Sequence, residues 1–252
     1  MCDWREVNSV KEKEGLQPEK GYLECEKWWI FALLMMVGGF YGAYTYSIRG
    51  GVFCNAQTAN FVLMAMAAGQ GKWQQACYYL IPMSAYLLGA IVSEAVPKPI
   101  KRKHIIRWDT LLILIEIIAV IALGFLPEDT PFQVSQITIN FICSMQYNTF
   151  RQAQGVPMAT TFCTNHLRQT GVAIVKAVKT RGEPAHIKRL GEHAGMLAVF
   201  VLGAVCSTIL CGRWAGRAIW GALLPLSIVF VDLLYADLKK EHAYIEQTPH
   251  GH

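Results

Sequence analysis

The chain has 252 residues, of which 53% are hydrophobic and only 16% are charged. Soluble domains carry about 25% charged residues, and here the charges collect between long uncharged stretches, which is typical of spanning helices joined by wet loops. The net charge of +5 is interpreted as membrane orientation, so no nucleic-acid partner is expected. The eight cysteines form no CxxC pair, and we expect neither a metal nor a cofactor.

The first 27 residues are rich in charge and contain no apolar core long enough for a cleavable signal peptide. We therefore expect residues 1–27 to form a cytoplasmic segment and the apolar stretch from Trp28 to be an uncleaved first span. A single membrane domain is predicted over 28–236, and residues 237–252 are predicted to form a cytoplasmic tail.

Eight apolar or semi-apolar segments follow one another within this domain, which predicts an all-α polytopic fold. They are 28–47, 54–69, 75–96, 108–126, 134–151, 157–178, 195–211 and 218–236. Most are long enough to cross about 30 Å of hydrocarbon. The segments 54–69 and 157–178 each begin with a run of polar side chains that is costly in lipid, so these two are predicted to be re-entrant or broken helices.

The distribution of Lys and Arg supports this interpretation. If all eight segments cross, the basic residues divide fairly evenly between the two sides. If 54–69 and 157–178 re-enter instead, the basic loop 97–107 joins the N-terminus, the 176–194 loop and the tail on one side. The positive-inside rule favours the second arrangement. It predicts six spans with both termini in the cytoplasm, as in a bacterial inner-membrane protein.

The two parts of the chain resemble each other. The sequence Leu-Gly-Ala-Ile-Val-Ser at 88–93 is echoed by Leu-Gly-Ala-Val-Cys-Ser at 202–207, and Gly-Val at 51–52 by Gly-Val at 155–156. Thr-Ala-Asn at 58–60 corresponds more loosely to Thr-Asn-His at 164–166. We therefore predict a first repeat over 28–126 and a second over 134–236. Three crossings per repeat would invert the second repeat relative to the first, as in many transporters.

Two motifs carry a resemblance to a known family. The stretch from Gly38-Gly39-Phe40 through Arg49-Gly50-Gly51 to Asn55-Ala56-Gln57-Thr58-Ala59-Asn60 resembles the first-half motif of the YoaK family. Met145-Gln146-Tyr147-Asn148, followed by Ala159-Thr160-Thr161-Phe162-Cys163-Thr164, is similar to its second motif. The resemblance runs from about Trp28 to Tyr235. It implies a bacterial membrane protein of this fold, and it implies no substrate.

The polar residues of these motifs are the candidate substrate-binding set. A re-entrant helix exposes its first N–H groups inside the membrane, where they favour anions or polar oxygens. The predicted binding residues are Asn55, Gln57, Thr58, Asn60, Gln146, Asn148, Thr160, Thr161, Thr164 and Asn165. The alternative is that these side chains only cap helices or join neighbouring helices.

Four further residues are predicted to serve a pathway or ion coupling. Gln136 and Asn140 begin an i, i+4 polar series that continues through Ser144 and Asn148 and could line a wet path or bond a neighbouring helix. Arg168 lies within a polar segment. Glu116 lies in an otherwise apolar segment. A carboxyl group there is a candidate site for proton binding and release, or it forms a buried hydrogen bond with a purely structural role.

The sequence thus predicts a transporter or channel-like permease for a small polar or anionic solute, with membrane lipids as its surroundings and homo-oligomerisation left open. No GxSxG, HExxH, P-loop or Rossmann pattern is present, so no catalytic residue is assigned. One alternative is a membrane enzyme acting on a lipid-linked substrate through groups such as Asp109, Glu94 or His166. Another is a membrane scaffold without transport.

Overall fold

The computed structural model describes residues 21–96, 106–241 and 247–250. Residues 1–20, the greater part of the basic loop 97–107 and parts of the predicted tail 237–252 lie outside the described residues. The described chain is almost entirely helical, which confirms the predicted all-α class. Two short antiparallel strands, β1 (Gln152–Ala153) and β2 (Val156–Pro157), are the exception within it.

The helices follow the predicted segments closely in the first half of the chain. They are η1 (Glu24–Glu26), α2 (Trp28–Ile48), α3 (Gln57–Gly69), α4 (Trp73–Ala95) and α6 (Trp108–Gly124). Helix α2 is a continuous apolar helix that ends at Ile48, and Arg49 caps its C-terminus. Gly50 and Gly51 follow with positive φ angles of 81° and 70°, a conformation that glycine adopts without steric cost.

The second half departs further from the predicted segments. It contains α7 (Phe132–Thr149), α8 (Thr164–Lys179), α9 (Pro184–Trp214), the 3-10 helix η2 (Ala215–Ala222), α10 (Leu223–Tyr235) and the π-helical turn η3 (Ala236–Lys240). Helix α9 starts eleven residues before the predicted apolar segment because Pro184, at its first position, favours helix initiation. Helix α8 starts at Thr164, since the residues before it form β2 and a non-helical loop.

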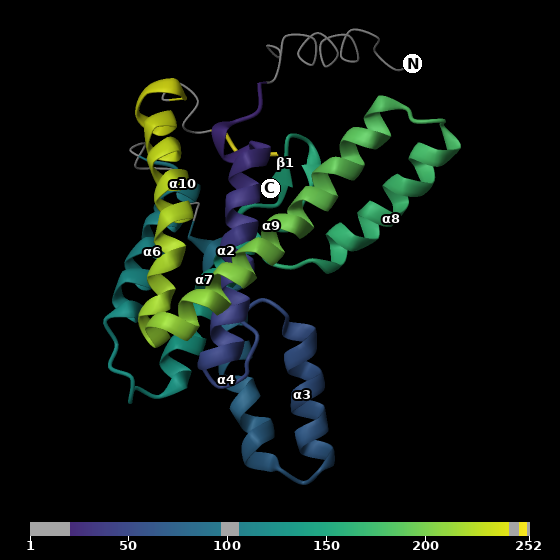
Figure 1. The fold of residues 1–252 in the computed structure, drawn as a ribbon. Coiled ribbons are helices and arrows are strands. Elements are labelled where there is room, and N and C mark those ends of the chain that lie inside the picture. Colours follow the sequence, from purple (N-terminus) through teal and green to yellow (C-terminus); the bar gives the residue numbers. More distant parts are fainter. Residues whose placement is uncertain (1–20, 97–105, 242–246, 251–252) are drawn as a thin grey trace, which may run out of the picture.

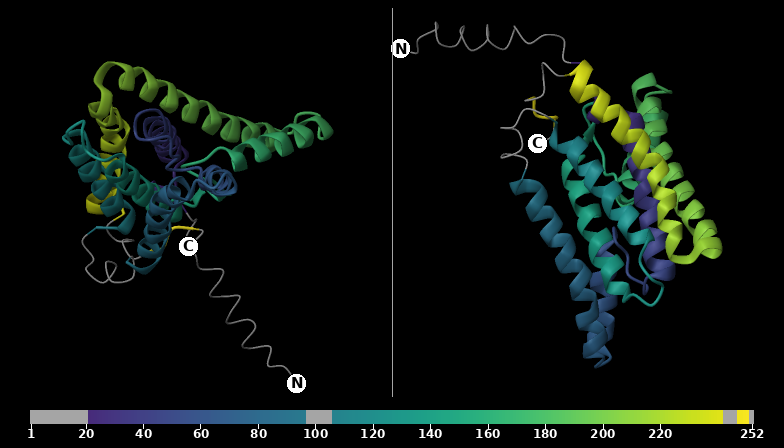
Figure 2. Two further views of the ribbon diagram at one scale, coloured as in Figure 1. Left: turned by 90° about the horizontal axis from the view of Figure 1, so that it is seen from below. Right: turned by 90° about the vertical axis from the view of Figure 1, so that its left-hand side faces the viewer.

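Long helices from different halves pack against each other. Helix α2 lies along α9, α4 lies along α7, and α6 packs on α10 (Figures 1 and 2). The closest backbone approaches occur at glycines. A methyl group at Gly89 of α4 would collide with the carbonyl oxygen of Phe141, and one at Gly203 of α9 with that of Met36. Glycine at these positions allows the helix backbones to touch.

The shorter helices α3 and α8 pack mainly against the helix that follows each of them, α4 and α9. After α2, residues 49–56 turn back, and α3 starts beside α2 before running outward (Figure 1). After β2, the chain likewise turns back before α8 starts. In the view of Figure 1 the α3–α4 hairpin projects downward and the α8–α9 hairpin projects to the upper right. This arrangement matches the two short polar helices that were predicted.

Three helical stretches of the described chain are long and apolar enough to cross a membrane: Trp28–Ile48, Trp73–Ala95 and a window within Pro184–Lys240. They are compatible with a membrane protein. Helix α6 has 17 residues, which corresponds to about 25 Å. The predicted number of six spans stays a prediction.

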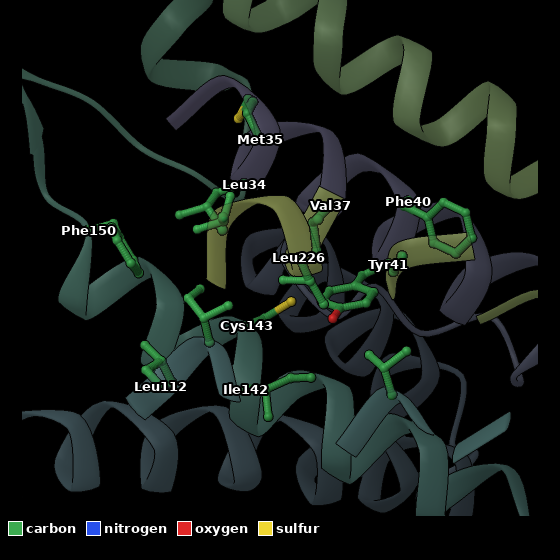
Figure 3. Close-up of a cluster of buried hydrophobic side chains, with 14 of the residues drawn as sticks. Leu34, Met35, Val37, Phe40, Tyr41, Leu112, Ile142, Cys143, Phe150 and Leu226 are labelled. Carbon is green, nitrogen blue, oxygen red and sulfur yellow. The ribbon is translucent and has the colours of Figure 1, made fainter. Parts of the chain in front are cut away.

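The hydrophobic core lies where α2, α6, α7 and α10 meet. Figure 3 shows Tyr41 of α2 beside Cys143 of α7, with Leu112, Ile142 and Leu226 around them. All five side chains are buried. Helices α2 and α7, which carry parts of the polar motifs, are therefore held by this apolar centre.

Candidate functional site

The loop before α3 is held by amide side chains. Asn60 donates from Nδ2 to the carbonyl oxygen of Phe53 at 2.6 Å and accepts the Phe53 amide at 3.1 Å. Asn55 donates to the carbonyl oxygen of Gly38 on α2 at 2.8 Å. Both side chains are buried, and these bonds satisfy backbone groups that a loop would otherwise leave unpaired. The predicted binding residues Asn55 and Asn60 are thus engaged in holding this loop.

Polar side chains of α7 face this loop. Asn140 accepts from Gln57 at 2.8 Å and donates to the carbonyl oxygen of Gln136. Gln136 in turn donates to the carbonyl oxygen of Arg49 and to the Tyr78 hydroxyl of α4. The structure brings the predicted series of α7 together with the first motif. Gln136, Asn140 and Ser144 of this series are buried among protein groups, whereas Asn148 at its end is only partly buried.

The loop before α8 presents polar groups that lack partners. Thr160 and Thr161 are fully buried, and neither hydroxyl has a hydrogen-bond partner among the described residues. Gln146 donates to the carbonyl oxygens of Leu34 and Thr160 at 3.3 and 3.5 Å, while its own Oε1 is buried without a partner there. These three predicted residues converge on one place beside α2.

Other predicted residues lie away from this place. Thr58, Thr164 and Arg168 are exposed, and Arg168 donates to the half-buried Asn165 at 3.1 Å. These side chains are not gathered with the buried group. Arg168, predicted as a pathway residue, therefore lies on the outside of α8.

Glu116 is completely buried in α6, and neither of its carboxyl oxygens has a partner in the described part of the chain. It lies close enough to Tyr41 and Cys143 for their charged forms to interact electrostatically with it. The Tyr41 hydroxyl is also buried without a partner there. Next to them the sulfur atoms of Cys143 and Cys54 are 3.7 Å apart. A carboxyl, a phenol and two thiols therefore share one interior region.

A histidine pair joins α8 to α9. His166 Nδ1 and His193 Nδ1 are 3.0 Å apart, and His166 Nε2 is 2.8 Å from the carbonyl oxygen of Ala159. A carbonyl oxygen only accepts, so His166 carries its proton on Nε2, and His193 must donate from Nδ1. His193 Nε2 is then a buried lone pair without a partner among the described residues. The pairing joins residues 27 positions apart, which sequence reasoning did not predict.

An open cleft of about 270 Å³ lies between the end of α7 and the start of α8. Its lining includes Tyr147, Asn148, Arg151, Phe162 and Asn165. Arg151 is half-buried and pairs with Glu94 at the end of α4 at 2.9 Å. Asn148 donates to Ser93 at 2.8 Å. Two predicted binding residues, Asn148 and Asn165, thus belong to this cleft and not to the buried group.

A family model described as a protein of unknown function (DUF1275) matches residues 30–231. The chain belongs to the DUF1275 family. No curated protein and no solved structure matches the chain. The DUF1275 match extends from α2 into α10, and so contains both polar loops, both short helices and the cleft.

Arg49 of this DUF1275 chain is a site that the sequence did not reveal. An arginine directly after a span is typically expected at the lipid interface, yet Arg49 is only 2% exposed. It donates from Nε to the Tyr44 hydroxyl at 3.0 Å. Its Nη2 lies beside Gly216, whose amide donates to Glu128, and this nitrogen is buried without a hydrogen-bond partner among the described residues. The sequence did not reveal this buried position, because Gly216 and Glu128 are far from Arg49 along the chain.

Within the described part of the DUF1275 chain, no group of three or more His, Cys, Asp or Glu side chains is arranged to hold a metal ion. The buried polar atoms without partners on Thr160, Thr161, Gln146, Tyr41 and Glu116 are hydroxyl oxygens, an amide oxygen and a carboxyl group. Such a set can form hydrogen bonds to a solute and exchange a proton.

Proposed function

We propose that this DUF1275 protein is an integral membrane transporter that moves a small polar or anionic solute past the loops that precede α3 and α8. The observation that carries the proposal is the presence of two groups of buried polar atoms without partners among the described residues. One group holds the Thr160 and Thr161 hydroxyls and Gln146 Oε1, and the other holds the Tyr41 hydroxyl and the Glu116 carboxyl. Each such polar atom costs about 1–3 kcal/mol when it stays unpaired. A polar solute or water bound there would offset that cost.

The pairing of elements supports an internal repeat. If α2, α3 and α4 of the first half correspond to α7, α8 and α9 of the second, each contact should have a counterpart. The α2–α9 contact has its counterpart in α7–α4, and the α3–α4 contact has its counterpart in α8–α9. The glycine contacts Gly203–Met36 and Gly89–Phe141 correspond in the same way. Asn60 and His166 each bond a carbonyl oxygen seven residues earlier. Inverted repeats with short helices that begin inside the bundle are a common transporter plan.

The charges of the two hairpin tips support the proposed orientation in a bacterial inner membrane. The turn between α3 and α4 carries Lys72, whereas the α8–α9 hairpin carries Lys176, Lys179, Arg181 and Lys188 around its turn. The positive-inside rule puts the second tip in the cytoplasm. The start of α2 and the end of α10 lie toward that same end of the molecule (Figure 1), which agrees with two cytoplasmic termini.

The test is solute-dependent flux in sealed proteoliposomes of the purified full-length protein, measured as current or counterflow over a library of small polar metabolites. Thr161→Val and Thr160→Val keep the side-chain volume and remove the hydroxyl, and we expect flux to fall about tenfold or more. Thr164→Val, at an exposed threonine, is the matched control and should leave flux unchanged.

Equal flux in Thr161→Val and Thr164→Val would remove the buried loop from the pathway. If the folded protein moved no library member, transport itself would be contradicted. Turnover of a lipid-linked substrate in detergent, without a sealed compartment, would then favour the membrane enzyme.

A further inference from the structure

The cleft between α7 and α8 combines one cation with aromatic and amide groups. Arg151 supplies the guanidinium, Tyr147 and Phe162 supply rings whose centroids are 4.7 Å apart, and Asn148 and Asn165 supply amides. Pro157 and Met158 complete an apolar wall. Small-molecule sites typically have this composition, with an apolar lining and a few polar groups that fix orientation.

The guanidinium of Arg151 is held in a fixed position. Its Nε donates to the carbonyl oxygen of Asn148 at 2.6 Å, and its Nη2 donates to Asn148 Oδ1 at 2.8 Å. Because the planar fork is already oriented by α7, less side-chain entropy is lost when an anion binds it. Asn148 is in turn held by its bond to Ser93 on α4.

A carboxylate already occupies this guanidinium. Glu94 Oε2 accepts from Arg151 Nη2 at 2.9 Å, yet the Glu94 side chain is 70% exposed and the Arg151 side chain 33% exposed. An exposed ion pair contributes only about 0–1 kcal/mol. Glu94 Oε2 also accepts from Asn148 Nδ2 at 3.4 Å. Glu94 therefore shows that the site accepts a carboxylate, and its exposed pair with Arg151 is one that another carboxylate can replace.

The cleft also borders the buried polar group. Ala159 and Phe162 line it, and the residues between them are Thr160 and Thr161, whose hydroxyls are buried without partners among the described residues. The same loop therefore lines the cleft with Ala159 and Phe162 and carries the two buried hydroxyls between them.

We propose that this cleft is the reception site for a small planar organic anion, whose carboxylate replaces Glu94 on Arg151 while its apolar part lies against Tyr147 and Phe162. The inference rests on the proposed transport function and names the class of solute: organic monoanions rather than cations or neutral polyols. Glu94 acts as a competing internal anion that keeps the guanidinium neutralised when the cleft is empty.

The experiment uses purified full-length protein in nanodiscs of neutral phosphatidylcholine and titrates benzoate, with benzyl alcohol and benzylammonium as the neutral and cationic counterparts. Binding is followed by the midpoint of thermal unfolding and by calorimetry. Benzoate should bind and the two counterparts should not. Arg151→Gln should weaken benzoate binding by about tenfold or more, and Arg151→Lys by less. Arg213→Gln, an exposed arginine on α9, should leave it unchanged.

Glu94→Gln gives the sharpest readout because its effect has the opposite sign. Removing the internal competitor should tighten benzoate binding several-fold, which a merely structural role of the ion pair would not do. Equal benzoate affinity in the wild type and Arg151→Gln, or no benzoate binding at all, would overturn the inference. Arg151-dependent stabilisation by phosphatidylglycerol nanodiscs in place of benzoate would assign the cleft to a lipid phosphate and overturn it too. All these readouts are binding measurements, so they can fail while the flux test on Thr161 succeeds.

Discussion

Glu116 is a carboxyl group in an environment that disfavours its charged form. It is completely buried, and neither carboxyl oxygen is hydrogen-bonded within the described residues. An ionised carboxylate in such a place costs several kcal/mol, whereas the neutral acid costs far less. The nearby groups Tyr41 and Cys143 are themselves neutral at pH 7 in their ordinary forms. The fold therefore selects the protonated acid at this position.

Glutamine imitates that neutral acid in size and polarity. We expect Glu116→Gln to unfold at about the same temperature as the wild type, because it keeps the neutral form, and to abolish uptake driven by a pH gradient, because it cannot release a proton. The paired measurements are thermal unfolding in detergent and proton-driven flux in proteoliposomes. Unchanged pH-driven uptake in this variant would show that Glu116 has no part in coupling.

Glu24 lies outside the predicted spans, and its pKa is set by burial acting against two ion pairs. Burial by itself would raise the pKa of this carboxyl, but hydrogen bonds from Lys240 and Lys27, at 2.8 Å and 2.5 Å, outweigh burial and lower the pKa below its ordinary value. A carboxyl whose pKa is lowered by folding contributes stability above its unfolded pKa. That contribution is lost as the pH falls through the folded pKa.

Acid should therefore destabilise the wild type more than Glu24→Gln. We expect the two proteins to differ most in unfolding temperature near pH 7 and to converge as the pH approaches 4 and falls below it. The measurement is a series of thermal unfolding curves in detergent between pH 7 and pH 3.5. A difference that stays constant over this range would mean that Glu24 does not act through its charge.

At the scale of elements, the two glycine contacts decide how closely the long helices approach. Gly89 and Gly203 lie directly against a carbonyl oxygen of the facing helix. Adding a methyl group there forces the helices apart, which costs about 1–3 kcal/mol in a packed interior. We expect Gly89→Ala and Gly203→Ala to be destabilised by about this amount in chemical unfolding.

Gly171 and Gly191 are the matched controls because they lie in α8 and α9 with no atom within 4 Å of an added methyl group. Their replacement by alanine should leave stability unchanged or increase it by about 0.5–1 kcal/mol, since alanine favours the helix. Destabilisation of Gly171→Ala as large as that of Gly203→Ala would show that helix packing is not the cause.

The sequence revealed the elements better than their ends. Apolar runs locate α2, α4, α6 and α10. An apolar run ends at the first charged residue, however, whereas a helix can continue through charged residues. Lys188 and Glu192 precede the apolar part of α9 and are still helical. In the opposite sense, Pro157 and the residues up to Cys163 precede α8 without joining it. Polarity at the start of a segment indicated a short helix, and it could not say at which residue the helix begins.

The candidate site was predictable only where it follows from local sequence. Clusters such as Asn55 with Asn60 and Thr160 with Thr161 are adjacent in the chain and can be recognised as polar groups in apolar surroundings. Pairs such as His166 with His193, or Arg151 with Glu94, join different helices. Their meeting depends on how those helices cross, and a single sequence does not contain that information.

At the scale of the whole molecule, the arrangement predicts which turns face which compartment. Lys72 and Arg181 are exposed at the two hairpin tips, and the α3–α4 hairpin ends at the bottom and the α8–α9 hairpin at the upper right of the molecule in Figure 1. In a cysteine-free variant, we expect Arg181→Cys to be labelled by a membrane-impermeant reagent only after the cytoplasm is opened, and Lys72→Cys to be labelled in intact cells. Labelling of both from one side would contradict the inverted arrangement.

The packing of the short helices also has a consequence for the order in which the helices reach their final positions during synthesis. Helix α3 finds its main contact in α4, and α8 in α9, and in each case the supporting helix is synthesised later. At 13 and 16 residues with polar first turns, neither short helix is a good insertion signal by itself. We therefore expect neither short helix to be held in place before the helix that follows it has been made. Chains truncated just after Gly69 or Lys179 should then be degraded faster than the full-length chain.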